Sequence, residues 1–77
     1  TATVTILPVT SELTEAPLLR ISLDPNAENG LRKRSQVMVD KPMTIQREKI
    51  GQKVGVLGQE EMLQIDRSLA LFLGIAG

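Results

Sequence analysis

The sequence predicts a small antiparallel sheet or partly open barrel of short strands, followed by one C-terminal helix. Two observations predict this fold. Short β-rich segments bounded by Pro, Gly, Asn and Asp occupy residues 3–57. A stripe of apolar residues at three- and four-residue steps then occupies residues 59–73. Strands first and a helix last are typical of a helix packed on an antiparallel sheet. Residues 1–77 are therefore expected to form a single small domain.

The first part of the chain predicts two strands and two turns. Residues 3–9 are β-rich, with Thr alternating with Val and Ile, and Pro8 suits the end or the edge of a strand. Residues 19–23 alternate Leu, Ile and Leu with Arg and Ser, which predicts a half-buried strand. The segments 24–26 and 28–30 are Asp-Pro-Asn and Glu-Asn-Gly, which are turn sequences.

The middle of the chain predicts two further strands. Residues 36–40 form the third strand, with both Val side chains on one face and the other three side chains on the opposite face. Residues 54–57, between two glycines, predict a short fourth strand. The segment 45–50 lies between these strands and is expected to form one helical turn.

The last element is a helix predicted over residues 59–73. Glu60 and Glu61 lie in its first turn, where the helix dipole favours acidic groups. Gly74 is placed to end it. The apolar stripe consists of Met62, Ile65, Leu69, Phe72 and Leu73.

The composition excludes several kinds of site. Without Cys, the chain has no disulfide and no thiolate metal site, and without His it lacks the common zinc ligands and any Ser-His or Cys-His nucleophile pair. Proton transfer would therefore use Asp, Glu, Lys or Arg. The sequence has a single aromatic residue, Phe72, so we do not expect it to bind RNA by stacking bases on aromatic side chains. A chain this short without a staple is expected to pair with another subunit.

The charges balance overall but are unevenly distributed. The chain has nine basic and nine acidic residues, yet residues 32–53 contain seven basic residues and two acidic ones. A local positive field of this kind can hold phosphates, although charge alone favours an ordinary solvated face. No apolar run approaches the ~20 residues of a membrane span, and no signal-peptide pattern is present. We expect a soluble, cytoplasmic protein without membrane contact.

Several polar residues are candidates for chemistry, each with an ordinary alternative. Asp40, beside several cations, could act as a general base or hold an arginine, or it could simply bond the backbone of a turn. Thr10 and Ser11 follow the first strand, where hydroxyls can contact phosphate or merely form a turn. From these residues alone, the ordinary alternatives are favoured and no reaction can be named.

Three strings in order resemble the MazF/PemK/Kid toxins. They are LPVTS at 7–11, GLRKRSQVMVDKPMTIQREKIGQKVGVL at 30–57 and EEMLQIDRSLALFLGI at 60–75. Members of that family share a P-(V/I)-T strand end and a strand like G-L-x-K-x-S-x-V-x-x-D-Q. They continue with R-(L/I)-G-x-x-(I/V/L)-G-x-L and a closing helix. The resemblance covers nearly the whole chain and is strongest over residues 30–75.

The resemblance implies an SH3-like barrel with a C-terminal helix, of the CcdB/MazF/Kid kind, working as a homodimer. It also implies a sequence-selective endoribonuclease toxin that cleaves single-stranded mRNA without a metal or cofactor. A cognate antitoxin would cover the RNA groove. In the implied reaction the ribose 2′-OH attacks the neighbouring phosphate, aided by proton transfer and by positive charge.

Particular residues match the family's motifs. Thr10 matches the active-site Thr at the strand end, and Asp40 matches the acid or base of the Kid-like branch. In that branch an Arg precedes the Asp by two residues, whereas this chain has Met38, so the usual pair is broken. Phosphate contacts are expected from the remaining candidates, which are Ser11, Arg32, Lys33, Lys41 and Arg47.

The family also opens with a strand, a loop and an Arg-Pro pair, and nothing before Thr1 supplies them here. We therefore expect the chain to be incomplete at its N-terminus and weakly active or inactive by itself. Two other functions stay open. One is a non-catalytic module that only dimerises or binds antitoxin. The other is a gyrase-poisoning toxin of the same fold, which ranks lower because those toxins end in a helix with a Trp and this chain has none.

Overall fold

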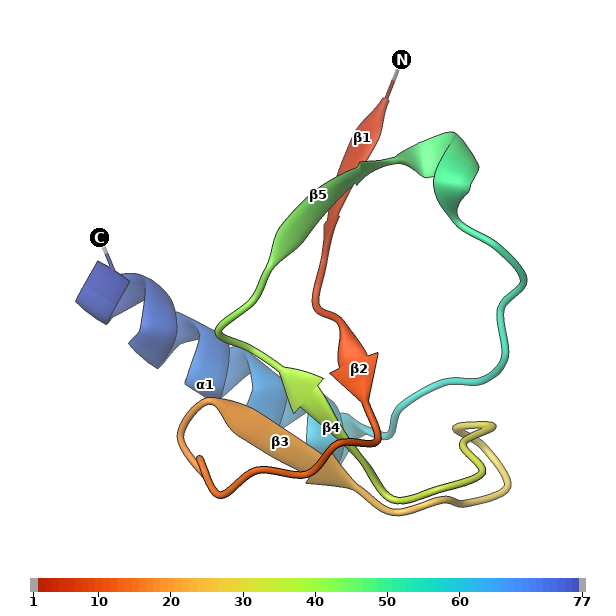
Figure 1. Ribbon diagram of the computed structural model, residues 1–77, viewed down its shortest axis with the longest axis horizontal. Helices are drawn as coiled ribbons and strands as arrows, with labels where there is room; N and C mark the ends of the chain where they lie inside the picture. The colour runs from red at the N-terminus through yellow and green to blue at the C-terminus, as the bar shows by residue number, and fades with distance from the viewer. Residues whose placement is uncertain (1, 77) are drawn as a thin grey trace.

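A computed structural model, which describes residues 2–76, shows short antiparallel strands followed by one long helix (Figure 1). The strands and helices are β1 (Thr3–Ile6), β2 (Val9–Thr10), β3 (Arg20–Leu23), β4 (Ser35–Met38), β5 (Met43–Gln46), the 3-10 helix η1 (Arg47–Lys49) and α1 (Gln59–Ala76). The order of strands first and helix last is the one that the sequence predicts. No helix in residues 2–76 is both long enough and apolar enough to cross a bilayer.

The strands form two separate antiparallel sheets. One has three strands in the order β2-β4-β3, and the other is a ribbon of β1 and β5. Figure 1 shows α1 against the three-stranded sheet and the β1–β5 ribbon extending away from it. Among residues 2–76 the two sheets do not join into a closed barrel. The expected antiparallel sheet with a terminal helix is confirmed, and closure of a barrel is not seen.

Pro8 lies where the predicted first strand divides in two. Residues 3–9 were expected to form one strand, but the ladder is interrupted at Leu7 and Pro8, and β2 begins at Val9. Pro8 has no N–H to donate, but its carbonyl accepts the N–H of Met38 at 2.8 Å. The chain therefore passes from pairing with β5 to pairing with β4 within two residues.

The segment between β4 and α1 differs most from expectation. The helical turn predicted within residues 45–50 is confirmed as η1 over Arg47–Lys49, while residues 45 and 46 still belong to β5. The predicted strand over residues 54–57 is wrong, because this segment forms no ladder. It crosses the 28–30 turn closely, and its backbone bond there runs from the Val56 N–H to the Glu28 carbonyl at 2.8 Å.

The core lies between the three-stranded sheet and α1. Its buried apolar residues are Ile21, Leu23, Val37, Val39 and Ile65, with Leu69 and Phe72 packed against them. The predicted helix stripe is therefore confirmed at its centre. Its ends are exposed: Met62 and Leu73 do not enter the core. The helix also continues through Gly74 to Ala76, since an exposed glycine need not end a helix.

Candidate active site

The outer face of the three-stranded sheet, opposite the core, collects the polar side chains. The alternation that buries Ile21 and Val37 turns Arg20, Ser22 and Gln36 to the other face. In the antiparallel register, Gln36 lies between Thr10 of β2 and Ser22 of β3, while Arg20 lies opposite Met38. Side chains from three strands therefore share this face.

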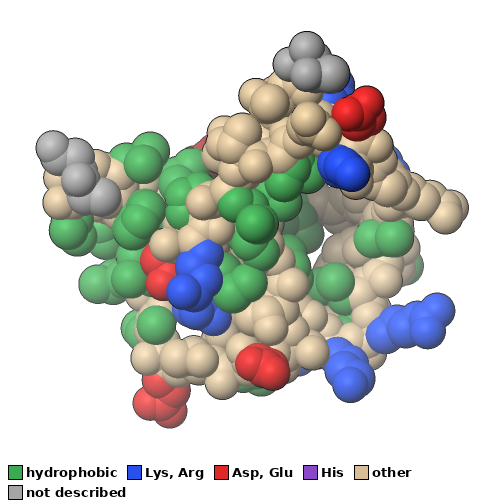
Figure 2. Space-filling model, turned by 45° about the horizontal axis from the view of Figure 1, so that its top comes forward, with side chains coloured by type: hydrophobic (Ala, Val, Ile, Leu, Met, Phe, Trp, Pro, Cys, Tyr) green, Lys and Arg blue, Asp and Glu red, His purple; other side chains and the backbone are tan. Residues whose placement is uncertain are grey.

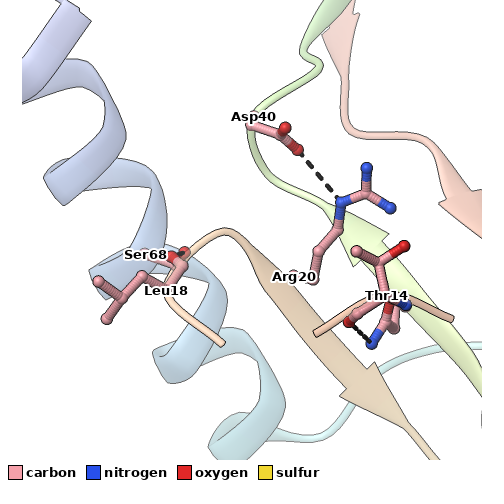
Figure 3. Close-up of polar contacts among 6 residues, drawn as sticks. Thr14, Leu18, Arg20, Asp40 and Ser68 are labelled. Carbon is pink, nitrogen blue, oxygen red and sulfur yellow. Dashed lines mark hydrogen bonds and ion pairs between the residues drawn. The ribbon is translucent and has the colours of Figure 1, made fainter. Parts of the chain in front are cut away.

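Asp40 meets an arginine on this face. Its Oδ1 lies 3.4 Å from Nε of Arg20, and the two side chains are 26% and 13% exposed (Figure 3). The two residues are diagonal neighbours, because Arg20 is directly opposite Met38 and Asp40 follows two residues later. A turn in which the Lys41 N–H donates to the Met38 carbonyl at 3.2 Å holds Asp40 just beyond the end of β4.

The contact between Asp40 and Arg20 is ionic and lacks hydrogen-bond geometry. Oδ1 of Asp40 is buried and accepts no hydrogen bond from residues 2–76. A buried carboxylate oxygen without a donor is unusual, since most buried polar groups are hydrogen-bonded. The exposed part of this side chain therefore lies on its other atoms, which include Oδ2. The arrangement can hold a negative charge beside a guanidinium and still present one carboxylate oxygen to a ligand.

The loop between β2 and β3 is fastened over the same face by Gln36. Gln36 Oε1 accepts the Thr14 N–H at 3.0 Å, and its Nε2 donates to the Thr14 carbonyl at 3.0 Å. The buried Gln36 amide thus binds the loop backbone in both directions, and Nε2 also lies 3.4 Å from the Ser22 hydroxyl. The loop forms one wall of an open cavity of about 530 Å³. Besides that loop, the cavity is lined by Arg20, Ile21 and Ser22 of β3, Gln36 of β4 and Gln64 of α1.

Thr10 and Ser11 lie at the end of β2. Thr10 is half-buried, and its Oγ1 accepts the Glu12 N–H at 3.1 Å, while Ser11 is exposed. This bond forms the plain turn that was the alternative to a phosphate contact at Thr10. The hydroxyl of Thr10 acts as acceptor in it, so its own hydrogen stays available for a second bond. Thr10 shares the outer face with the Arg20–Asp40 pair but lies beside Gln36, whereas Asp40 lies beyond Met38. The site is therefore elongated along β4.

The predicted phosphate-binding cations come from three parts of the fold. Arg32 and Lys33 lie in the loop before β4, Lys41 follows Asp40, and Arg47 begins η1 beside the β1–β5 ribbon. All four are exposed. Figure 2 shows that Lys and Arg side chains on the displayed face stand in separate groups with apolar and tan surface between them. They do not form one continuous basic patch on that face.

The comparisons with known proteins agree with this fold. The model of a family described as PemK-like, MazF-like toxins of type II toxin–antitoxin systems matches residues 1–73. The chain belongs to the PemK/MazF toxin family. A probable endoribonuclease MazF of Mycolicibacterium smegmatis is 46% identical to this toxin chain over 77 residues, which are 100% of the chain and 71% of the relative.

Two solved structures share the fold of this toxin. The Mycobacterium tuberculosis toxin MazF-mt6 superposes with a TM-score of 0.82 at 24% identity, covering 94% of this chain and 70% of that one. Another Mtb toxin gives a TM-score of 0.78 at 24% identity, covering 91% of this chain and 74% of its own. The strands and the long helix are thus arranged as in MazF-type toxins.

Arg20 is the residue of this toxin's candidate site that sequence reasoning missed. Met38 does leave Asp40 without a cation on its own strand, but the neighbouring strand β3 supplies one. The alternation of residues 19–23 already places Arg20 on the polar face. Its meeting with Asp40 depends on which residues of β3 and β4 are opposite each other, and no motif in the sequence states that register.

Proposed function

We propose that the protein is a sequence-selective endoribonuclease toxin that cuts single-stranded mRNA in the cytoplasm without a metal or cofactor. Family membership and the endoribonuclease name of the relative support the class of reaction. The observation that carries the proposal for this chain is the half-buried Asp40 held against Arg20, on the sheet face that also carries Thr10. These groups can transfer a proton and stabilise negative charge, which RNA cleavage requires.

The proposed reaction uses the RNA's own 2′-OH as the nucleophile. Asp40 accepts the proton of the 2′-OH as the bond from O2′ to phosphorus forms. The bond from phosphorus to O5′ then breaks, and O5′ takes up a proton from a solvent water. The products are a 2′,3′-cyclic phosphate and a 5′-OH, so no outside oxidant or co-reactant is needed. The Thr10 hydroxyl donates a hydrogen bond to an oxygen of the scissile phosphate.

The remaining polar candidates are proposed to guide the RNA strand. Ser11, next to Thr10, and Lys41, next to Asp40, can contact phosphates at the two ends of the site. Arg32, Lys33 and Arg47 lie farther along the surface. Their separation suits an extended single strand better than a compact ligand, because an RNA backbone presents a phosphate at every nucleotide.

Two partners belong to the proposal. The toxin works as a homodimer, which fits its small core, and a cognate antitoxin covers the RNA site. In the working dimer the two sheets belong to an SH3-like barrel. The 77-residue chain by itself is expected to cleave RNA weakly or not at all, so activity is best measured on the intact toxin beside this chain.

Single-turnover cleavage of RNA by the intact toxin tests the proposal. Asp40→Asn removes the proton acceptor and is expected to slow cleavage by ~10²–10⁴-fold. Thr10→Ala removes one hydrogen bond to phosphate and is expected to slow it by about tenfold. The matched control is Asp24→Asn, because Asp24 also pairs with an arginine, Arg34, at 3.2 Å but is 81% exposed. The control is expected to cleave within about twofold of the wild type.

Two results would contradict the proposal. Unchanged cleavage by folded Asp40→Asn would remove Asp40 from the mechanism. An intact toxin that binds its antitoxin firmly but cuts no RNA would favour the non-catalytic module. A supercoiling assay with purified gyrase separates the gyrase-poisoning alternative, for which the chain lacks the terminal Trp.

A further inference from the structure

The guanidinium of Arg20 is held by one of its nitrogens and leaves the other two available. Nε faces Oδ1 of Asp40 at 3.4 Å. In Figure 3 the drawn contact with that carboxylate ends on Nε, and neither of the two terminal nitrogens carries a drawn contact. They make no hydrogen bond to residues 2–76. Because a guanidinium is planar, fixing Nε also restricts the direction in which the terminal N–H groups point.

The backbone on both sides of the Arg20–Asp40 pair is fixed. The Arg20 N–H donates to the Ala16 carbonyl at 2.8 Å, and β3 pairs with β4 from Arg20 to Leu23. The Arg20 side chain is only 13% exposed, so little of it is free to move in solvent. A cation held in this way loses little conformational entropy when it binds a ligand.

Arg20 offers hydrogen-bond donors, Asp40 offers a proton acceptor, and the two lie side by side. The two terminal nitrogens of Arg20 supply N–H donors in a fork that matches two oxygens of a phosphate. The exposed part of Asp40 includes an oxygen that can accept a proton. In RNA, a 2′-OH to be deprotonated and a phosphodiester with two non-bridging oxygens are neighbours on the same nucleotide. The Arg20–Asp40 pair therefore has donors for the phosphodiester and an acceptor for the 2′-OH proton.

We propose that Arg20 is a catalytic residue that binds the non-bridging oxygens of the scissile phosphate through its terminal nitrogens while Nε positions Asp40. This inference rests on the proposed ribonuclease function. As O2′ attacks phosphorus, the negative charge on the phosphoryl oxygens grows, and the guanidinium neutralises it. Arg20 also lines the cavity of about 530 Å³, although neither Asp40 nor Thr10 does. The one acidic residue in that lining is Glu15, in the loop.

The competing role for Arg20 is purely structural, fastening β3 to the turn after β4. A Lys at position 20 separates the two roles, because it keeps the charge beside Asp40 but loses the planar fork. If Arg20 binds the phosphate, Arg20→Lys in the intact toxin is expected to lower kcat by ~10²–10³-fold, the effect of losing a donor to a developing oxyanion. Its Tm should stay close to that of the wild type.

The chain offers a matched control in Arg34→Lys. Arg34 also uses Nε to approach an aspartate Oδ1, in this case Asp24 at 3.2 Å, but that pair is exposed. Arg34→Lys is expected to keep kcat within about twofold. In Arg20→Ala, millimolar guanidinium is expected to restore part of the cleavage in a saturable way without raising Tm. Folded Arg20→Lys that cleaves within threefold of the wild type would overturn the proposal.

Binding of an RNA that carries 2′-O-methyl at every position tests the phosphate contact of Arg20 separately from the proposed cleavage of RNA. Such RNA cannot be cleaved by its 2′-oxygen. Arg20→Lys is expected to bind it several-fold more weakly, and Arg20→Ala should lower the salt dependence by about one phosphate contact. A wild type that cuts no RNA but shows these binding losses would refute the ribonuclease and retain the phosphate contact. Equal binding by wild type and both variants would overturn the phosphate contact itself.

Discussion

Gly30 and Gly55 mark the place where the 28–30 turn and the segment before α1 cross. Gly30 has φ of +69°, the left-handed region, and a Cβ added there would lie 2.2 Å from the Val54 carbonyl oxygen. A Cβ on Gly55 would lie 2.3 Å from the carbonyl carbon of Asn29. The buried Asn29 side chain holds the turn in shape by accepting the N–H of Leu31 at 3.0 Å. Two backbones can approach this closely only without side chains between them.

Gly30→Ala is the sharpest residue-scale test of this crossing. The substitution forces an L side chain into positive φ and places its methyl group against backbone, so it is expected to cost about 2–4 kcal/mol of unfolding free energy. Urea unfolding followed by circular dichroism measures this cost. The control is Gly51→Ala, where an added Cβ meets nothing within 4 Å and the expected change is within about 1 kcal/mol. Equal unfolding midpoints for the two variants would contradict the close crossing.

At the scale of the element, α1 begins with a partial capping box. Gly58 precedes the helix, and its N–H donates to Oε1 of Glu61 at 2.8 Å. Glu61 is in the third helical position, from which a glutamate reaches back to the cap residue. Gly58 has no side chain to return the bond, so Glu61 supplies the capping interaction alone. Further along the helix, the Ser68 hydroxyl donates to the Leu18 carbonyl and joins α1 to the turn before β3.

Glu61→Ala is expected to destabilise the protein by about 1 kcal/mol, because it removes the capping bond and one favourable charge at the helix N-terminus. Glu60→Ala removes the same charge from an exposed neighbour without a capping bond, and should cost only about half as much. Thermal unfolding of the two variants beside the wild type measures the difference. If Glu60→Ala proves as harmful as Glu61→Ala, the capping bond contributes nothing beyond charge.

The elements that the sequence predicts well are those with clear periodicity. The alternation in residues 19–23 and the stripe through Ile65 and Leu69 depend on local pattern, and both appear in the structure. Residues 54–57 have the composition of a strand but pair with no other strand in the structure, and composition cannot reveal that. The meeting of Arg20 with Asp40 likewise depends on the register of β3 and β4. Pairing between distant segments was therefore the part that could not be predicted.

At the scale of the whole molecule, the hydrophobic core is small compared with the apolar surface that stays exposed. Five apolar side chains are buried among the described residues: Ile21, Leu23, Val37, Val39 and Ile65. By contrast, large apolar side chains such as Leu18, Val54 and Ile75 are 66%, 74% and 75% exposed. A domain of this size is marginally stable when it buries so little. Association with a second copy would cover part of this surface, which supports the proposed homodimer.

Association of this kind makes stability depend on concentration. If the intact toxin unfolds from a dimer to separate chains, each tenfold increase in protein concentration favours the folded dimer by about 1.4 kcal/mol. For two chains of this size, Tm should then rise by about 3–5 °C per tenfold. Calorimetry over a hundredfold concentration range, with sedimentation to give the mass, measures this. A Tm that does not change over that range, together with a monomer mass, would show that the exposed apolar surface serves another purpose than self-association.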